Sequence, residues 1–122
     1  MAGKSISTRR VYDPPGPNEG YRVLVDRLWP RGVKKQDLHH DEWLKQVAPS
    51  GALRRWFGHD PERFAEFERR YRHELEGNAD LDHLVEIAED RPITLLYAAR
   101  DSEHNHARVL AELIRERLAL RG

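Results

Sequence analysis

A dense group of charged and aromatic side chains directly follows the apolar run Val23-Leu-Val25. The members that could contact a ligand are Asp26, Arg27, Trp29, Arg31 and Lys35. Arginine presents a planar fork of donors that matches carboxylate and phosphate groups, and tryptophan presents a flat face for stacking. The segment therefore predicts a site for an anionic ligand with a flat ring. A structural alternative is that Asp26 pairs with an arginine while Trp29 closes the end of the core.

A second group lies at residues 97–106, where an apolar strand meets the last expected helix. Asp101 or Ser102 is expected to cap that helix, which would leave backbone N–H groups and the positive end of the helix dipole in the crevice. His104, Asn105 and His106 would fall in the first turn, where a histidine can exchange a proton near neutral pH. The same side chains could instead tie down the loop. Because His104 and His106 are two positions apart, a helix would direct them to different faces, and we expect no metal site.

Basic and aromatic residues are interspersed between these two groups. They are Trp43, Lys45, Pro49, Ser50, Arg54, Trp56, Phe57 and His59. Such residues could extend an anion pocket or form a groove for unpaired bases. They could also belong to a helix pair packed on the sheet, which favours core positions for the large aromatic side chains. Arg54 and His59 therefore remain the candidate ligand contacts of this region.

Composition narrows the classes of protein to which the chain can belong. Its 122 residues suit one domain, and 21 Lys+Arg balance 21 Asp+Glu, so no global field attracts nucleic acid or an anionic membrane. The absence of cysteine excludes disulfides, thiolate catalysis and Cys-based zinc sites. No Walker loop, dinucleotide glycine fingerprint or nucleophile elbow is present, so we expect no cofactor. The lack of a signal peptide or membrane-spanning run favours a cytoplasmic protein.

Hydrophobic patterns predict the elements that position these groups. Strands are expected at residues 5–12, 21–28 and 92–99, and the last two are apolar on both faces in their centres, which is typical of central strands. Helices are expected at 50–58 with Ser50 as its cap, at 60–77, after Asp80, and at about 103–120. This order favours an α/β fold, a small three-layer sheet with mostly parallel central strands and helices on both faces. Residues 29–46 form the least regular segment.

The longer sequence motifs resemble a known family. They are Arg22-Val-Leu-Val-Asp-Arg-Leu-Trp-Pro-Arg-Gly32, Trp56-Phe-Gly-His59, Thr94-Leu-Leu-Tyr-Ala98, and Asp101 with Asn105-His-Ala107. From about residue 11 to residue 118 the chain resembles the YeaO-like family of uncharacterised bacterial proteins, DUF488. The resemblance implies a small cytosolic α/β protein with no assigned activity and no established cofactor. Related branches carry Cys-His-Arg where this chain has Asn105-His-Ala107, so thiol chemistry is not implied for this chain.

We hypothesise that one set of side chains converges at the carboxyl ends of the central strands and binds a small anion, such as a nucleotide or sugar phosphate. The set is Asp26, Arg27, Arg31, His59, Asp101, Asn105 and His106, with Trp29, Lys35, Arg54 and Ser102 as further ligand contacts. In this hypothesis Arg27 and Arg31 hold the anion. Asp26 or Asp101 orients the cluster or acts as a base, and His59 or His106 exchanges a proton. If chemistry occurs, hydrolysis or group transfer fits these residue types.

Two alternatives remain open at this point. The basic and aromatic residues Trp29, Arg31, Lys34, Lys35 and Arg54 could form a non-catalytic module that binds single-stranded nucleic acid or a protein partner. The charged residues could instead form an internal ion-pair network. A steep loss of affinity with added salt would favour nucleic acid, because a protein that neutralises several phosphates releases their counterions.

Overall fold

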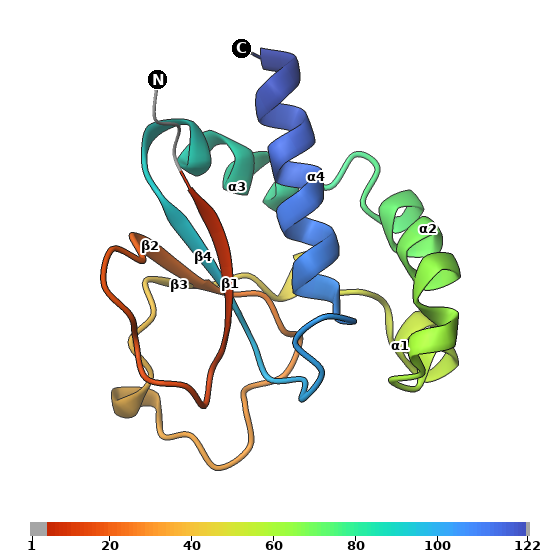
Figure 1. Ribbon diagram of the computed structural model, residues 1–122, viewed down its shortest axis with the longest axis horizontal. Coiled ribbons are helices and arrows are strands. Elements are labelled where there is room, and N and C mark those ends of the chain that lie inside the picture. Colours follow the sequence, from red (N-terminus) through yellow and green to blue (C-terminus); the bar gives the residue numbers. More distant parts are fainter. Residues whose placement is uncertain (1–4, 122) are drawn as a thin grey trace.

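The structure is a computed structural model that describes residues 5–121. Four parallel strands form one sheet in the order β1-β4-β2-β3 (Figure 1). The strands are β1 (Ile6–Arg10), β2 (Tyr21–Leu24), β3 (Glu42–Trp43) and β4 (Ile93–Tyr97). The helices are α1 (Gly51–Phe57), α2 (Phe64–Glu74), α3 (Ala79–Asp90) and α4 (His106–Arg121), with the short 3-10 helices η1 (Lys35–Asp37), η2 (Lys45–Val47) and η3 (Pro61–Arg63). The predicted α/β class and the central places of the two apolar strands are confirmed.

The two faces of the sheet are covered differently. On one face, Ile93, Leu95 and Tyr97 of β4 join a large cluster that takes buried residues from all four α-helices. On the other face, Leu96 packs with Leu38 and other residues of the irregular segment 29–43. This segment contains proline and glycine and no helical apolar repeat, so before the short strand β3 it forms only the 3-10 helix η1. We expected helices on both faces of the sheet. The structure has α-helices on one face, whereas a loop with one short 3-10 helix covers the other.

Local capping decides where the helices begin. Ser50 caps α1 as predicted, since its hydroxyl accepts the Leu53 N–H at 3.1 Å. The prediction that Asp80 caps the next helix is wrong. The Asn78 side chain accepts the Leu81 N–H at 2.9 Å instead, and α3 begins at Ala79, one residue before Asp80. Asp80 therefore lies inside the first turn, where a carboxylate still complements the helix dipole.

Gly20 joins the β1–β2 connection to the sheet. Its φ is +67°, and a Cβ there would lie 2.1 Å from the backbone oxygen of Pro92. The same oxygen accepts the Tyr21 N–H at 2.9 Å, at the point where β2 begins to pair with β4. Glycine is needed here because two backbones approach closely in a left-handed conformation. The register of β2, and so the position of Asp26 two residues after its end, depends on this contact.

The long helices of the described residues are amphipathic. None of them is long and apolar enough to cross a membrane.

Candidate functional site

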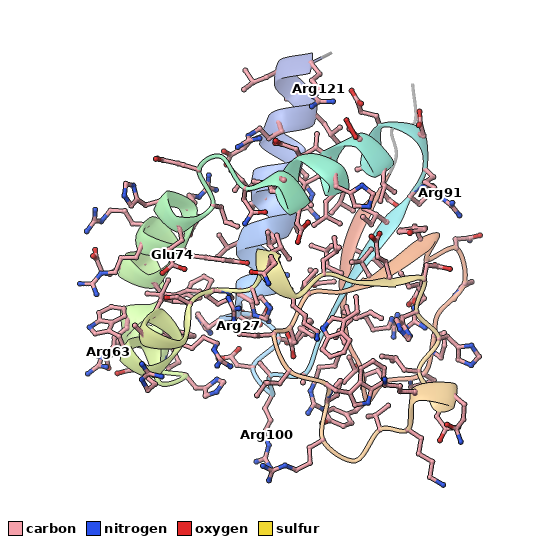
Figure 2. All side chains as sticks on the ribbon, turned by 180° about the vertical axis from the view of Figure 1, so that it is seen from behind. Arg27, Arg63, Glu74, Arg91, Arg100 and Arg121 are labelled. Atoms are coloured by element: carbon pink, nitrogen blue, oxygen red, sulfur yellow. The ribbon has the colours of Figure 1, made fainter. Side chains whose placement is uncertain are left out.

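A cleft of about 590 Å³ lies at the carboxyl ends of β2 and β4. Its walls come from the segments that follow these two strands, from α1 and its C-cap, and from the start of α4. Open parallel sheets usually bind ligands at this edge. Figure 2 shows that Arg27 lies inside the array of side chains, whereas Arg63, Arg91, Arg100 and Arg121 extend outward at its periphery. Arg27 is also one of the lining residues, so the cleft has a cation on its wall.

Most of the predicted site residues line this cleft. They are Asp26, Arg27, Trp29, Arg31, Arg54, His59, Asn105 and His106. Asp101, Ser102 and Lys35 do not line it. Lys35 is exposed on η1, and Asp101 and Ser102 belong to the turn that precedes α4. His104 also lines the cleft, and so do residues that no sequence pattern had marked as ligand contacts, such as Tyr12 and Ala99.

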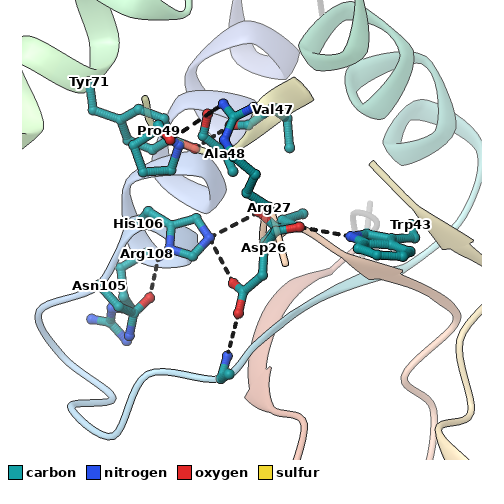
Figure 3. A network of polar contacts seen from close by, with 12 residues as sticks. Asp26, Arg27, Trp43, Val47, Ala48, Pro49, Tyr71, Asn105, His106 and Arg108 are labelled. Atoms are coloured by element: carbon teal, nitrogen blue, oxygen red, sulfur yellow. Dashed lines mark hydrogen bonds and ion pairs between the residues drawn. The ribbon is translucent and has the colours of Figure 1, made fainter. Parts of the chain in front are cut away.

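Asp26 and His106 form the centre of the site (Figure 3). The Asp26 Oδ2 atom accepts the backbone N–H of Ala98 at 3.0 Å, and Oδ1 lies 3.1 Å from His106 Nε2. The same Nε2 lies 3.0 Å from the backbone oxygen of Val25, and its N–H is better aligned with that oxygen. As a result, the buried Asp26 Oδ1 has an electrostatic partner but no well-aligned donor. The alternative in which Asp26 pairs with an arginine is wrong, because its ion-pair partner is His106.

Contacts from distant parts of the chain hold this centre in place. The Trp43 Nε1–H donates to the backbone oxygen of Asp26 at 2.8 Å. Trp29 packs edge to face on Trp43, with ring centroids 5.3 Å apart, and its own Nε1–H donates to Val33 at 2.6 Å. Trp29 thus packs on the second face of the sheet and also lines the cleft, so it combines the two roles that the sequence had left as alternatives.

Arg27 lies three residues after the end of β2, and its side chain extends away from the Asp26 carboxylate toward the segment before α1 (Figure 3). One terminal nitrogen donates to the backbone oxygens of Ala48 and Pro49 over 3.3 and 3.5 Å. The Nε atom is buried and has no hydrogen-bond partner, and none of the ion pairs among residues 5–121 involves this guanidinium. Buried donors in folded proteins are normally paired. Arg27 is thus an incompletely satisfied cation on a cleft wall.

Tyr71 supports the segment that Arg27 contacts. Its hydroxyl donates to the backbone oxygen of Val47 at 2.5 Å, and burial raises its pKa well above the usual range. The phenol therefore stays neutral and keeps its proton as a donor at physiological pH. Tyr71 fixes the Val47–Pro49 backbone and does not neutralise the Arg27 charge.

The remaining cations lie nearer the cleft mouth. Arg31 and Arg54 are exposed, and with Arg27 they face a single aspartate, so the charged lining residues sum to +2 when the histidines are neutral. His59 follows the left-handed Gly58 and itself has a φ of +57°, a conformation that side-chain-bearing residues rarely adopt. Strained backbone of this kind is concentrated at functional sites.

The turn before α4 differs from the prediction. Asp101 Oδ1 accepts the N–H groups of Glu103 and His104 at 2.9 and 3.1 Å, and Oδ2 lies 2.9 Å from His104 Nδ1. These hydrogen bonds, first the one from the Glu103 backbone, lower the pKa of Asp101. They also hold residues 101–104 in a turn, so α4 begins at His106 with Asn105 as its cap, accepting the Arg108 N–H at 3.1 Å. Contrary to expectation, neither Asp101 nor Ser102 caps α4. The backbone N–H groups of Glu103 and His104 already donate to Asp101.

Comparison with known proteins places the chain in a family. It is 47% identical over 116 residues to the uncharacterized protein YeaO of Escherichia coli (strain K12), covering 91% of this chain and 97% of that protein. It is 44% identical over 112 residues to the uncharacterized proteins Rv3073c of Mycobacterium tuberculosis and Mb3100c of Mycobacterium bovis, covering 92% of this chain and 95% of each relative. A family profile described as "Inactive DUF488-N3 subclade" matches residues 5–122. The chain belongs to the DUF488 family.

The resemblance expected from the sequence motifs is thereby confirmed. The DUF488 match spans every segment that lines the cleft, from Tyr12 to His106. No solved structure matches the chain. Because the relatives are themselves uncharacterized, the function of this DUF488 protein has to be argued from the chemistry of its cleft.

Proposed function

We propose that the cleft binds a small anionic ligand that also carries a flat apolar part, such as a nucleotide or a sugar phosphate with a ring. The observation that carries this proposal is Arg27, a half-buried guanidinium that has no ion-pair partner among residues 5–121, in a lining of net charge +2. Its second terminal nitrogen, Nη1, has no hydrogen bond among the described residues and is not one of the buried polar atoms, so a phosphate or carboxylate in the cleft can accept from it. Charge-assisted hydrogen bonds of this kind are the stronger ones. Arg31 and Arg54 would contact the anion from the mouth.

The apolar part of the lining supports a ligand larger than a simple ion. A volume of about 590 Å³ falls within the usual range of small-molecule sites. Trp29 and Phe57 line the same cleft, and Leu28 is 67% exposed at its wall although leucine is normally buried. A planar ring would cover these side chains while the anionic group meets the arginines.

Binding without turnover fits the site better than hydrolysis or group transfer. The matching DUF488 profile is described as an inactive subclade. Asn105, which stands where related branches carry cysteine, caps α4 through its Oδ1 and offers no nucleophile. Asp26 interacts with Ala98 and His106, and Asp101 lies outside the cleft lining. These positions favour a ligand-binding protein.

The proposal is tested by calorimetric titration with sodium sulfate, AMP and ribose 5-phosphate. Arg54→Ala should weaken the binding of each anion about tenfold, which is about 1.4 kcal/mol for one lost charge-assisted contact. Arg55→Ala is the matched control, since Arg55 is the adjacent exposed residue of α1 and does not line the cleft. Equal affinities in the two variants, or no binding to the unmodified protein, would contradict the proposal. Binding only to a single-stranded oligonucleotide, with a steep salt dependence, would support the alternative module.

A further inference from the structure

The proton on His106 Nε2 is fixed by its surroundings. This nitrogen lies 3.0 Å from the Val25 backbone oxygen and 3.1 Å from Asp26 Oδ1. A carbonyl and a carboxylate only accept hydrogen bonds, so Nε2 has to carry a hydrogen. The other ring nitrogen, Nδ1, is then the atom that gains or loses a proton when the imidazole titrates.

Nδ1 has no protein partner among the described residues. None of their hydrogen bonds involves this atom, and it is not among the buried polar atoms without a partner, so it is accessible. His106 itself lines the cleft. A ligand in the cleft can therefore meet Nδ1, either as a lone pair on the neutral ring or as an N–H on the protonated ring.

The groups around the ring leave its charge sensitive to a ligand. Asp26 favours a positive ring, whereas the Arg27 guanidinium and the amino end of α4 oppose one. Other titratable or charged groups also pack against the ring or share the cleft. They are Tyr71 from α2, with its ring centroid 6.2 Å away, Tyr12 from the segment after β1, Arg31 from the segment after β2, Arg54 and His59 from α1 and its end, and His104 from the turn before α4. An anion placed among these groups adds negative charge and favours the protonated ring.

We infer that the cleft is built for a dianionic group, a phosphomonoester or a sulfate, and that its binding takes up one proton at His106 Nδ1. This inference rests on the proposed function and adds the charge class of the ligand to it. The proton comes from solvent and gives an imidazolium that lies between Asp26 and the ligand. The new N–H donates to the anion, and the extra positive charge offsets the second negative charge of the dianion. A monoanionic carboxylate gains less from this proton.

Sulfate is the cleanest probe, because it stays a dianion from about pH 5.5 to 8, where imidazole normally titrates. Titration calorimetry in buffers of different ionisation enthalpy should show the uptake of up to one proton per bound sulfate. The affinity for sulfate should fall by up to about tenfold per pH unit on the alkaline side. Acetate should bind more weakly than sulfate and with less proton uptake.

His106→Gln separates proton uptake from binding. The glutamine amide can donate to Val25 and Asp26 as Nε2 does, but it cannot be protonated. This variant should still bind sulfate, with an affinity that is independent of pH and with no proton uptake. His83→Gln is the matched control, since His83 pairs with Glu42 away from the cleft. Thermal melts of both variants check that they are folded.

The outcomes are distinguishable from failure of the proposed function. If neither sulfate nor AMP binds, the proposed function is refuted together with the inference. Sulfate binding without proton uptake overturns the inference alone. So does uptake that persists in His106→Gln and is lost in His59→Gln or His104→Gln, because the proton would then reside on another cleft histidine.

Discussion

The Asp26→Asn substitution tests whether the Asp26 carboxylate organises the site. The side chain is 17% exposed, and its Oδ2 accepts the Ala98 N–H at 3.0 Å. Asparagine preserves the shape, so it can keep this hydrogen bond as a neutral one. Replacing a charged acceptor by a neutral one should cost about 1 to 1.5 kcal/mol.

The contact with His106 adds a second cost. The new amide NH2 group would face Nε2–H, which lies 3.1 Å from the present carboxylate oxygen. Two donors then oppose each other unless His106 changes tautomer, and that change would leave the Val25 oxygen without its donor. This adds about 0.5 to 1 kcal/mol, for a total of about 2 kcal/mol. For 122 residues the unfolding entropy converts 2 kcal/mol into a decrease in Tm of about 8 °C.

Urea unfolding and thermal melts at pH 7.5 measure both quantities. Asp37→Asn is the control, since Asp37 is an exposed aspartate on η1. A double-mutant cycle with His106→Ala, which removes the Nε2 donor, should give a coupling free energy of about 1 kcal/mol. A Tm for Asp26→Asn within 2 °C of the unmodified protein, or purely additive effects in the cycle, would refute the reasoning.

Further predictions concern the backbone and the turn before α4. Gly20→Ala should lower stability by about 3 kcal/mol, or about 12 °C in Tm, because the left-handed φ costs about 1 kcal/mol and the Cβ clashes with Pro92. Gly32→Ala, with a φ of +79° and nothing within 4 Å of its Cβ, should cost only about 1 kcal/mol in the same urea assay. His59→Gly should leave the Tm unchanged or raise it, since glycine relieves the strained φ, while sulfate titration shows weaker binding. Asp101→Asn should lower the Tm at pH 7, and its difference from the unmodified protein should vanish as the pH falls below about 3.9. The reason is that backbone hydrogen bonds lower the folded-state pKa of Asp101, so their stabilisation is present above the unfolded pKa and is lost through acidification.

Much of the fold could be predicted from local patterns. The apolar runs of β2 and β4 read as central strands because both of their faces are covered, and the structure places them in the middle of the sheet. The cap of α1 followed from Ser50, since capping depends on neighbours within three residues. The two-residue strand β3 was not predicted, because so short a strand is defined by its pairing partner in β2 and not by its own sequence.

The candidate site was predicted in part. Because open parallel sheets bind ligands at the carboxyl ends of their strands, we expected the residues after β2 and those after β4 to lie together. Most of them line one cleft. Asp101 was misplaced because its carboxylate can satisfy nearby backbone N–H groups. That local competition sets the turn and moves the start of α4 to His106.

The sequence alone determined which side chains are available at this edge of the sheet, through strand and helix periodicity, the absence of cysteine and the motifs of the family. The tertiary structure decided which of them meet. It placed His106 beside Asp26, 80 positions away in the chain, and it directed Arg27 to the backbone oxygens of Ala48 and Pro49. Those pairings follow from β4 inserting beside β2 and from α4 packing across the same face, and such long-range geometry is not encoded in the spacing of neighbouring residues.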